Sequence, residues 1–181
     1  NSPLLETYKE RGIEVLVMDD EIDELVAPAI GRYQDVELKS VSRSGTAEDL
    51  KTEGDKDKAK QIDPLLKKIK KVLGEEVKDV RASTRLSDSP SCIVADDNDP
   101  TIQMQHIFKA LGQKDLPEVK PILEINPDHS IVKKLAGTED KALSEDISRL
   151  LFEQALIVEG AELASPAEFA RRLNRVIDKS L

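Results

Sequence analysis

The sequence predicts an α+β protein, in which a small α/β unit precedes a larger domain with a three-stranded sheet and several helices. Short apolar runs bounded by turn residues are typical of strands, and longer segments with apolar residues every three or four positions are typical of helices. From residue 63 onward, a long helix is followed by three strands and at least four further helices. This mixture favours an α+β domain.

The composition excludes several classes of function. The 181 residues include 36 acidic and 27 basic residues, for a net charge of −9, and no tryptophan. An acidic chain with few aromatic residues is a poor candidate for nucleic-acid binding. No apolar run reaches the ~18 residues that cross a bilayer, so we expect no membrane partner. Cys92 is the only cysteine, which excludes an internal disulfide and fits a reducing, cytoplasmic location.

The first forty residues predict a small unit of helix, strand, helix and strand. The expected elements are a helix from Ser2 to Arg11, a strand over residues 13–18, a helix carrying Ile22, Leu25 and Val26, and a weaker strand over residues 36–41. Residues 13–18 are almost continuously apolar, which is typical of a strand covered on both faces. Asp19 or Asp20 is expected to cap the second helix, and Pro28 to limit its end.

Residues 42–60 are polar and highly charged, and they predict either a solvated tether or a charged helix. A further helix is expected to begin at Asp63-Pro64 and to end at Gly74. Its apolar stripe consists of Leu65, Leu66, Ile69, Val72 and Leu73.

Three strands are expected after this helix, over residues 77–81, 91–95 and 121–125. A helix from Asp99-Pro100 to Leu111 separates the second strand from the third. A short helix follows the third strand, beginning at residues 126–128 and ending at Gly137.

The last forty residues predict two amphipathic helices. The first runs roughly from Glu139 to Glu159, and the second opens at Ser165-Pro166 with a capping-box sequence. Their apolar stripes include Leu143, Ile147, Leu150 and Leu151 in the first helix, and Phe169, Leu173, Val176 and Ile177 in the second. The stripes are buried either in the chain's own core or against the same helices of a second copy. Periodicity is compatible with both arrangements.

No catalytic or metal site is predicted. The glycine-rich phosphate loops and the nucleophile-elbow motif are missing from the sequence. His106 and His129 have no Cys or His partner at ligand spacing, so we interpret them as a helix-face and a turn histidine. Cys92 stands among apolar strand residues and is expected to be buried and inert.

The helix that ends at Leu111 carries an apolar stripe formed by Met104, Ile107, Phe108 and Leu111. The simpler interpretation of this 3-4-7 spacing is ordinary core. The alternative is a partly exposed face that holds unfolded or flexible segments, because methionine and phenylalanine adapt to many partners.

Several short motifs, taken together, resemble one protein family. They are Gly12-Ile13-Glu14-Val15-Leu16, Ile22-Asp23-Glu24, Val77-Lys78-Asp79-Val80-Arg81, Arg85-Leu86-Ser87-Asp88-Ser89-Pro90 and Glu124-Ile125-Asn126-Pro127-Asp128-His129. In this order and spacing they resemble the carboxy-terminal third of the ninety-kilodalton heat-shock chaperone family, most closely its bacterial members. The resemblance covers nearly the whole chain.

The resemblance implies a fragment of an ATP-dependent chaperone of the stress response. Residues 1–54 would be the end of the family's middle domain with a linker, and residues 55–181 its carboxy-terminal dimerisation domain. The last helices of two protomers would form an intermolecular four-helix bundle. The implied homodimer interface contains Ile147, Leu150, Leu151, Phe169, Leu173, Val176 and Ile177.

The resemblance also implies a binding partner. Partly unfolded client proteins would bind at Leu25, Met104, Ile107, Phe108 and Leu111, although Leu25 stands where some bacterial relatives carry a large aromatic residue. ATP and Mg would belong to the nucleotide domain of the full-length protein, so this fragment is expected to be non-enzymatic and to hold no cofactor. The alternative is a purely structural dimerisation module without client binding.

Overall fold

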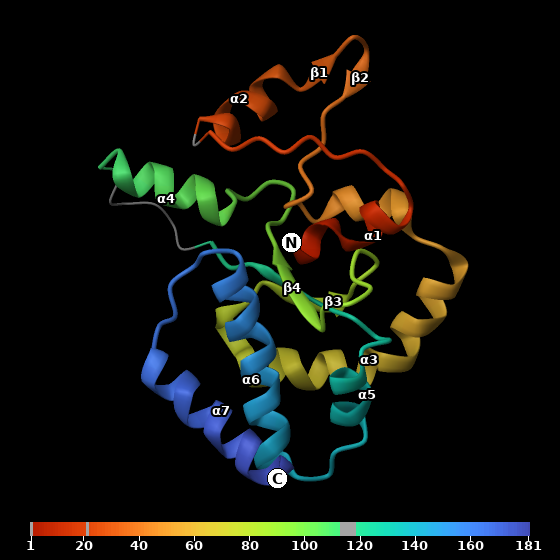
Figure 1. Ribbon diagram of the computed structural model, residues 1–181, viewed down its shortest axis with the longest axis vertical. Coiled ribbons are helices and arrows are strands. Elements are labelled where there is room, and N and C mark those ends of the chain that lie inside the picture. The colour runs from red at the N-terminus through yellow and green to blue at the C-terminus, as the bar shows by residue number, and fades with distance from the viewer. Residues whose placement is uncertain (1, 21, 113–118) are drawn as a thin grey trace.

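The computed structural model describes residues 2–20, 22–112 and 119–181, and consists of helices around a small mixed sheet (Figure 1). The sheet contains β3 (Asp79–Ala82), β4 (Ser91–Val94) and β5 (Ile122–Ile125) in the order β3-β5-β4. The central strand β5 is parallel to β3 and antiparallel to β4. All three expected strands are present, and this mixed architecture is compatible with the predicted α+β class.

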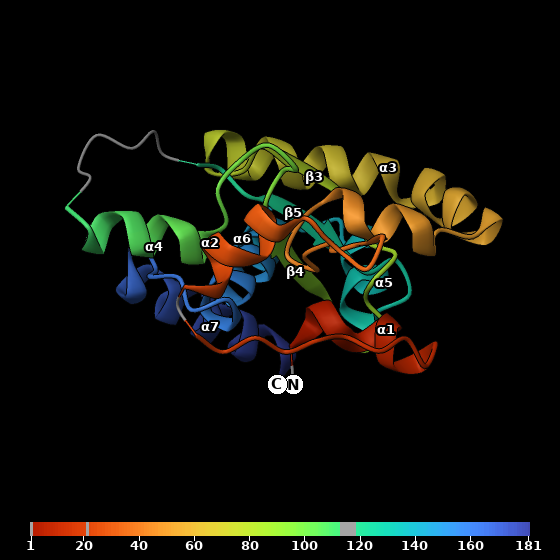
Figure 2. The same cartoon turned by 90° about the horizontal axis from the view of Figure 1, so that it is seen from above.

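The two faces of the sheet pack against different parts of the chain. The main core joins one face to three helices, α3 (Glu53–Leu73), α5 (Ser130–Ala136) and α6 (Lys141–Val158). Ile93 and Leu123 belong to this main core, whereas their strand neighbours Cys92 and Ile122 belong to a second cluster that includes Leu4. Successive strand residues point to opposite faces, so the second cluster lies on the other face. Figure 2 shows α3 and the N-terminal α1 (Glu6–Glu10) on opposite sides of the strands.

The expected N-terminal helix is present as two short helices. A 3-10 helix η1 (Pro3–Leu5) leads into α1, and the amide of Leu4 donates to the Ser2 hydroxyl at 3.2 Å. Gly12 follows the helix with φ of +65°, a conformation that favours glycine.

The predicted strand over residues 13–18 is wrong. The segment belongs to neither sheet formed by the described residues, and the side chains of Leu16 and Val17 are 73% and 80% exposed. An extended segment becomes a strand only when a neighbour pairs with its backbone, and the described residues supply none here. The apolar side chains of residues 16–18 therefore form a surface that the described chain leaves exposed.

The next elements are a helix and a hairpin. Helix α2 (Asp23–Ile30) continues past Pro28, contrary to the expected end, because proline removes one internal hydrogen bond but keeps a helical φ. Strands β1 (Arg32–Tyr33) and β2 (Val36–Glu37) pair antiparallel, so only the start of the expected 36–41 strand is formed. Gln34 and Asp35 have φ of 46° and 65°, which is typical of a two-residue type I′ turn.

Helix α3 begins ten residues before the expected start at Asp63, so the charged-helix interpretation holds for residues 53–60. The carboxylate of Asp55 accepts hydrogen bonds from the amide and hydroxyl of Thr52 at 2.8 and 2.7 Å, which caps this start. Pro64 lies inside the helix on its exposed side, where water can satisfy the freed carbonyl. The first part of the expected linker forms a 3-10 helix, η2 (Gly45–Leu50).

Helices α4 (Ile102–Ala110) and α7 (Pro166–Ser180) lie close to their expected positions. A short 3-10 helix that the sequence did not predict, η3 (Gly74–Glu76), follows α3. Thr101, and not Asp99, is the N-cap of α4, and His129 is the N-cap of α5. Among the residues that the structure describes, no helix is long and apolar enough to span a membrane.

Candidate functional site

Helices α2 and α4 lie side by side although about eighty residues separate them (Figures 1 and 2). The hydroxyl of Thr101 donates to the carboxylate of Glu24 at 2.9 Å and accepts from the amide of Met104 at 3.1 Å. Thr101 therefore caps α4 and joins it to α2. Its side chain is buried, so this contact forms without competition from water.

Of the five residues that the resemblance assigns to client binding, four lie on these two helices and Leu111 is the C-cap of α4. We call them the α2–α4 surface, formed by Leu25, Met104, Ile107, Phe108 and Leu111. Leu111 is 69% exposed, and the other four side chains are half-buried. None of the five belongs to the three core clusters of the described residues, whereas their neighbour Ile102 packs against the main core. Helix α4 thus anchors through Ile102 and leaves its longer apolar stripe outside the core.

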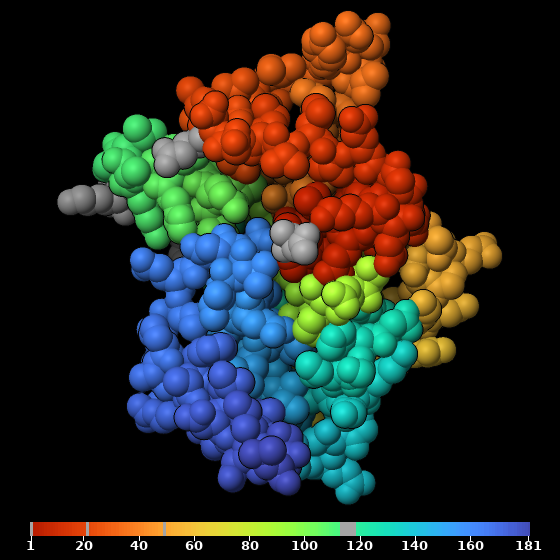
Figure 3. All heavy atoms as spheres, viewed as in Figure 1, coloured from red at the N-terminus to blue at the C-terminus, as the bar shows by residue number. Residues whose placement is uncertain are grey.

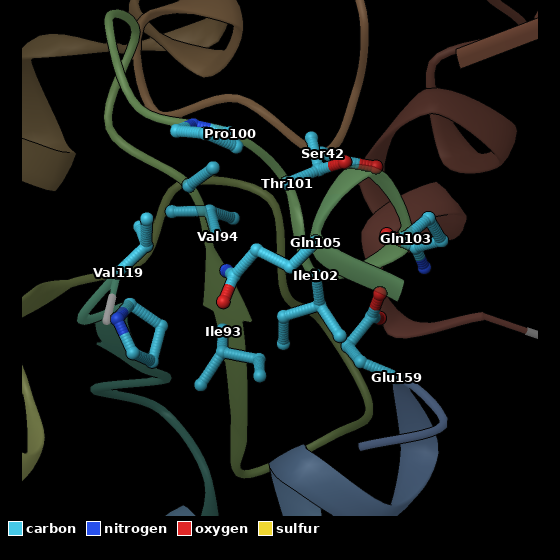
Figure 4. Close-up of a pocket in the computed structure, with 12 residues that line it drawn as sticks. Ser42, Ile93, Val94, Pro100, Thr101, Ile102, Gln103, Gln105, Val119 and Glu159 are labelled. Carbon is cyan, nitrogen blue, oxygen red and sulfur yellow. The ribbon is translucent and has the colours of Figure 1, made fainter. Parts of the chain in front are cut away.

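A small hollow lies beneath α4 (Figure 4). Its wall includes Ser42, Ile93, Ile102 and Glu159, and its volume is about 20 Å³, which suffices for one water molecule and not for an organic ligand. Burial raises the pKa of the Glu159 carboxyl, and a hydrogen bond with Gln103 opposes this rise. The hollow is therefore a small, mostly apolar gap between α4 and the end of α6, and it is too small to be a substrate pocket.

The terminal helices α6 and α7 run antiparallel. Arg172, Arg175 and Lys179 of α7 pair with Glu153, Asp146 and Asp140 of α6. The Arg175–Asp146 pair has two hydrogen bonds, of 2.8 and 2.6 Å. These pairs hold α7 along α6. Figure 1 shows the two helices side by side, and Figure 3 shows them on one face of the molecule.

Of the seven predicted dimer residues, three are half-buried outside the core clusters of the described residues (Leu150, Phe169 and Val176), and the other four divide into two groups. Leu151 is 2% exposed and belongs to the chain's own core, and Ile147 packs against that core. In α7, by contrast, no residue is buried, and Leu173 and Ile177 are 40% and 45% exposed. Helix α7 is amphipathic, but the described chain covers only part of its apolar stripe.

The two histidines lie on the helix and the turn that the sequence predicted for them. His106 is exposed on α4, and Nδ1 of His129 accepts a hydrogen bond from the amide of Ile131 at 3.2 Å. Among the described residues, no cluster of three or more His, Cys, Asp or Glu side chains could hold a metal ion. Cys92 is buried as expected, and its pKa lies well above the usual value because of burial and the nearby Glu124 carboxylate.

Comparison with known proteins decides the family. The family model described as Hsp90 protein matches residues 1–181, the whole chain. The chain belongs to the Hsp90 family. Its Hsp90 relatives include the chaperone protein HtpG of Treponema denticola, 52% identical over 180 residues, which cover 97% of this chain and 28% of the relative. The corresponding protein of Aliarcobacter butzleri is 47% identical over 187 residues, which cover 100% of this chain and 29% of the relative.

This Hsp90 chain spans less than a third of the length of these curated relatives. A third relative, the chaperone protein HtpG of Treponema pallidum, is 44% identical over 97% of the chain. The family membership therefore rests on nearly every residue of the chain.

Sequence reasoning missed the polar residues that join residues 1–47 of this Hsp90 chain to the sheet and its loops. Arg85 and Glu124 form a buried ion pair, and Arg43 binds the loop before α4. Glu6 accepts hydrogen bonds from the amides of Ser87, Asp88 and Ser89. Charged residues are frequent in this sequence and follow no periodic pattern. These partners, which are far apart in the sequence, could therefore be identified only from the structure.

Proposed function

We propose that this chain is the end of the middle domain and the dimerisation domain of an Hsp90 chaperone. In this proposal it forms a homodimer and supplies part of a client-binding surface. The observation that supports both roles is that α4 and α7 each present apolar side chains that the described fold leaves outside its core. The family match and the HtpG chaperone relatives support the chaperone role.

The homodimer is supported by the shape of the terminal helix pair. The ion pairs between α6 and α7 lie on one side of α7, and the exposed residues Leu173 and Ile177 remain available to a partner. Two copies of an antiparallel helix pair can bury such stripes in a four-helix bundle around a two-fold axis. A specific interface commonly buries roughly 1,600 Å² in total, which two helices from each protomer can supply.

Client binding is supported by the α2–α4 surface. Its half-buried Met104 and Phe108 have flexible or flat apolar side chains, which can adapt to many sequences. The contact rests on apolar area, with few directed hydrogen bonds, so each site should bind clients weakly and with little sequence preference. ATP and Mg would act elsewhere in the full-length protein, and this fragment would be non-enzymatic.

The test is binding of a partly unfolded client protein to the 181-residue chain and to the Phe108→Ala variant. We expect Phe108→Ala to weaken the affinity, with little change in melting temperature, because Phe108 lies outside the core clusters. Lys109→Ala is the matched control on the same helix, since Lys109 is exposed and outside the apolar stripe. Equal affinity of both variants and the parent chain would favour the purely structural dimerisation module.

A further inference from the structure

Residues 41–47, which we call the strap, follow the β1–β2 hairpin, include the first turn of η2 and pass beside the end of β4. The amide of Ser44 donates to the carbonyl of Ala95 at 2.9 Å, and the amide of Ala95 donates to the carbonyl of Ser42 at 2.9 Å. These two bonds form a single parallel bridge between Arg43 and Ala95. The rest of the strap is held by side chains.

Arg43 joins the strap to the loop that precedes α4. Its Nη1 lies 3.2, 2.7 and 2.9 Å from the backbone carbonyl oxygens of Asp96, Asp97 and Asp99. These carbonyls surround one cationic nitrogen, and the loop that carries them ends at Thr101, the N-cap of α4. Arg43 thus fixes the position from which α4 begins.

Asp97 reinforces the same junction from the loop side. Its Oδ1 accepts hydrogen bonds from the amide of Gly45 at 2.7 Å and from the hydroxyl of Ser44 at 3.2 Å. A Cβ at Gly45 would lie 2.5 Å from the Asp97 carboxylate, so a larger residue there would have to displace this carboxylate. Strap and loop therefore hold each other through two separate sets of bonds.

The sheet holds the strap from its other side. Arg85 is fully buried, and its guanidinium donates to the carbonyls of Val41 at 2.5 Å and Arg43 at 3.1 Å. Arg81 donates to the carbonyl of Ser44 at 2.8 Å. The strap is therefore fixed to the sheet. Arg43, which belongs to the strap, binds the loop before α4 and so holds the start of α4 in place relative to the sheet.

We propose that Arg43 is a positioning residue that sets α4 against α2 and so shapes the α2–α4 surface. This inference rests on the proposed function for the claim that the surface binds clients. Leu25 lies on the segment before the strap, and Met104 and Phe108 lie on the helix after the loop that Arg43 binds. Their alignment therefore depends on the strap-to-loop contact as well as on the Thr101–Glu24 hydrogen bond.

The chemistry of the contact predicts which variants keep it. Lysine at position 43 presents an ammonium that can donate to several carbonyls at once, whereas methionine presents none. The Arg43 side chain is half-buried and its loop is partly exposed, so water can reach the carbonyls that Arg43→Met leaves free. We therefore expect Arg43→Met to fold and to loosen the start of α4, and Arg43→Lys to retain most of the contact.

The test measures the distance between spin labels on α2 and α4 in the 181-residue chain. The labels are attached through the substitutions Ala29→Cys and Ala110→Cys, both at exposed positions, and the buried Cys92 should not react. We expect a distinctly broader or shifted distance distribution for Arg43→Met, and a distribution close to that of the parent for Arg43→Lys. Client affinity should fall roughly three- to tenfold in Arg43→Met and recover in Arg43→Lys.

Each outcome separates the two proposals. An unchanged distribution in Arg43→Met overturns the positioning role, even if its melting temperature falls. A broadened distribution with unchanged client affinity supports the positioning role and contradicts client binding at this surface. If Arg43→Met fails to fold, Arg43→Gln tests the same contact with a shorter, uncharged donor, and it must broaden the distribution for the inference to stand.

Discussion

The guanidinium of Arg85 and the carboxylate of Glu124 form an ion pair in the interior of the protein. The distance from Nε to Oε2 is 2.9 Å, and the two side chains are 0% and 2% exposed. Arg81 donates to the other carboxylate oxygen at 2.7 Å, and the Ser83 hydroxyl donates to Oε2 at 3.0 Å. Arg85 also donates to the carbonyls of Val41 and Arg43, so it links the central strand to the strap.

Removing Arg85 should destabilise the fold strongly. Arg85→Met leaves the Glu124 carboxylate with only one cationic partner in a buried site, and we expect a loss of about 3–5 kcal/mol. Denaturant unfolding measures this change. Lys141→Met, at an exposed position at the start of α6, is the control and should change stability by less than about 0.5 kcal/mol. Similar small losses for both variants would show that the buried pair contributes little.

Glu6 should make stability depend on pH. Burial is the largest influence and raises the pKa of its carboxyl, but the hydrogen bonds from the Ser89 hydroxyl and from the amides of residues 87–89 outweigh it. The pKa therefore lies below the ordinary value of 4.5, and the carboxylate stabilises the fold above that value. This contribution is lost as pH falls through the folded-state pKa.

The variant Glu6→Gln isolates this effect. It should be less stable than the parent at pH 7, and the difference should shrink as the pH falls below 4.5. Denaturant titrations between neutral and acidic pH provide the measurement. A difference that stays constant over this range would exclude Glu6 as the source of the pH dependence.

Two leucines of the terminal helices should respond differently to truncation. Leu151→Ala removes a side chain that is 2% exposed in the main core, so we expect a loss of about 2–5 kcal/mol. Leu173 is 40% exposed, so Leu173→Ala should change the stability of one protomer little and weaken dimerisation instead. Unfolding and sedimentation measurements on both variants separate the two roles. The same loss of folding stability in both would place Leu173 in the core.

Methionine oxidation tests the α2–α4 surface without mutation. The chain has two methionines, Met18, which is 49% exposed, and Met104, which is half-buried on α4. Dilute peroxide should oxidise both in the folded chain, and an added client protein should protect Met104. Mass spectrometry reads each site separately, with Met18 as the internal reference. Equal rates at Met104 with and without client would argue against binding there.

The sequence predicted the elements that apolar patterning defines. The sheet strands at residues 79–82, 91–94 and 122–125 are short apolar runs between turn residues, and α7 begins at the expected Ser165-Pro166 start. Apolar patterning gave a wrong prediction for residues 13–18. They have the composition of a buried strand, but no other strand among the described residues pairs with them. The early start of α3 depends on the hydrogen bonds between Thr52 and Asp55. This cap was not predicted, because Asp55 is one of many charged residues in its segment.

The candidate site was predictable only in part. The spacing of Met104, Ile107 and Phe108 identified the helix face, and the resemblance supplied Leu25. Arg43 and its three carbonyl partners could not be found, because residues 43 and 96–99 are far apart in sequence and backbone carbonyls have no residue signature. Long-range polar contacts of this kind appear only once the chain is folded.

The mass of the chain in solution tests the central claim most directly. Sedimentation equilibrium at roughly 50 μM, well above the Kd expected for a specific interface, should give twice the 20.1 kDa of one chain. Ile177→Glu should shift the mass toward one chain, because a carboxylate in an apolar interface is unfavourable. A parent chain that sediments at 20.1 kDa under these conditions would contradict the account.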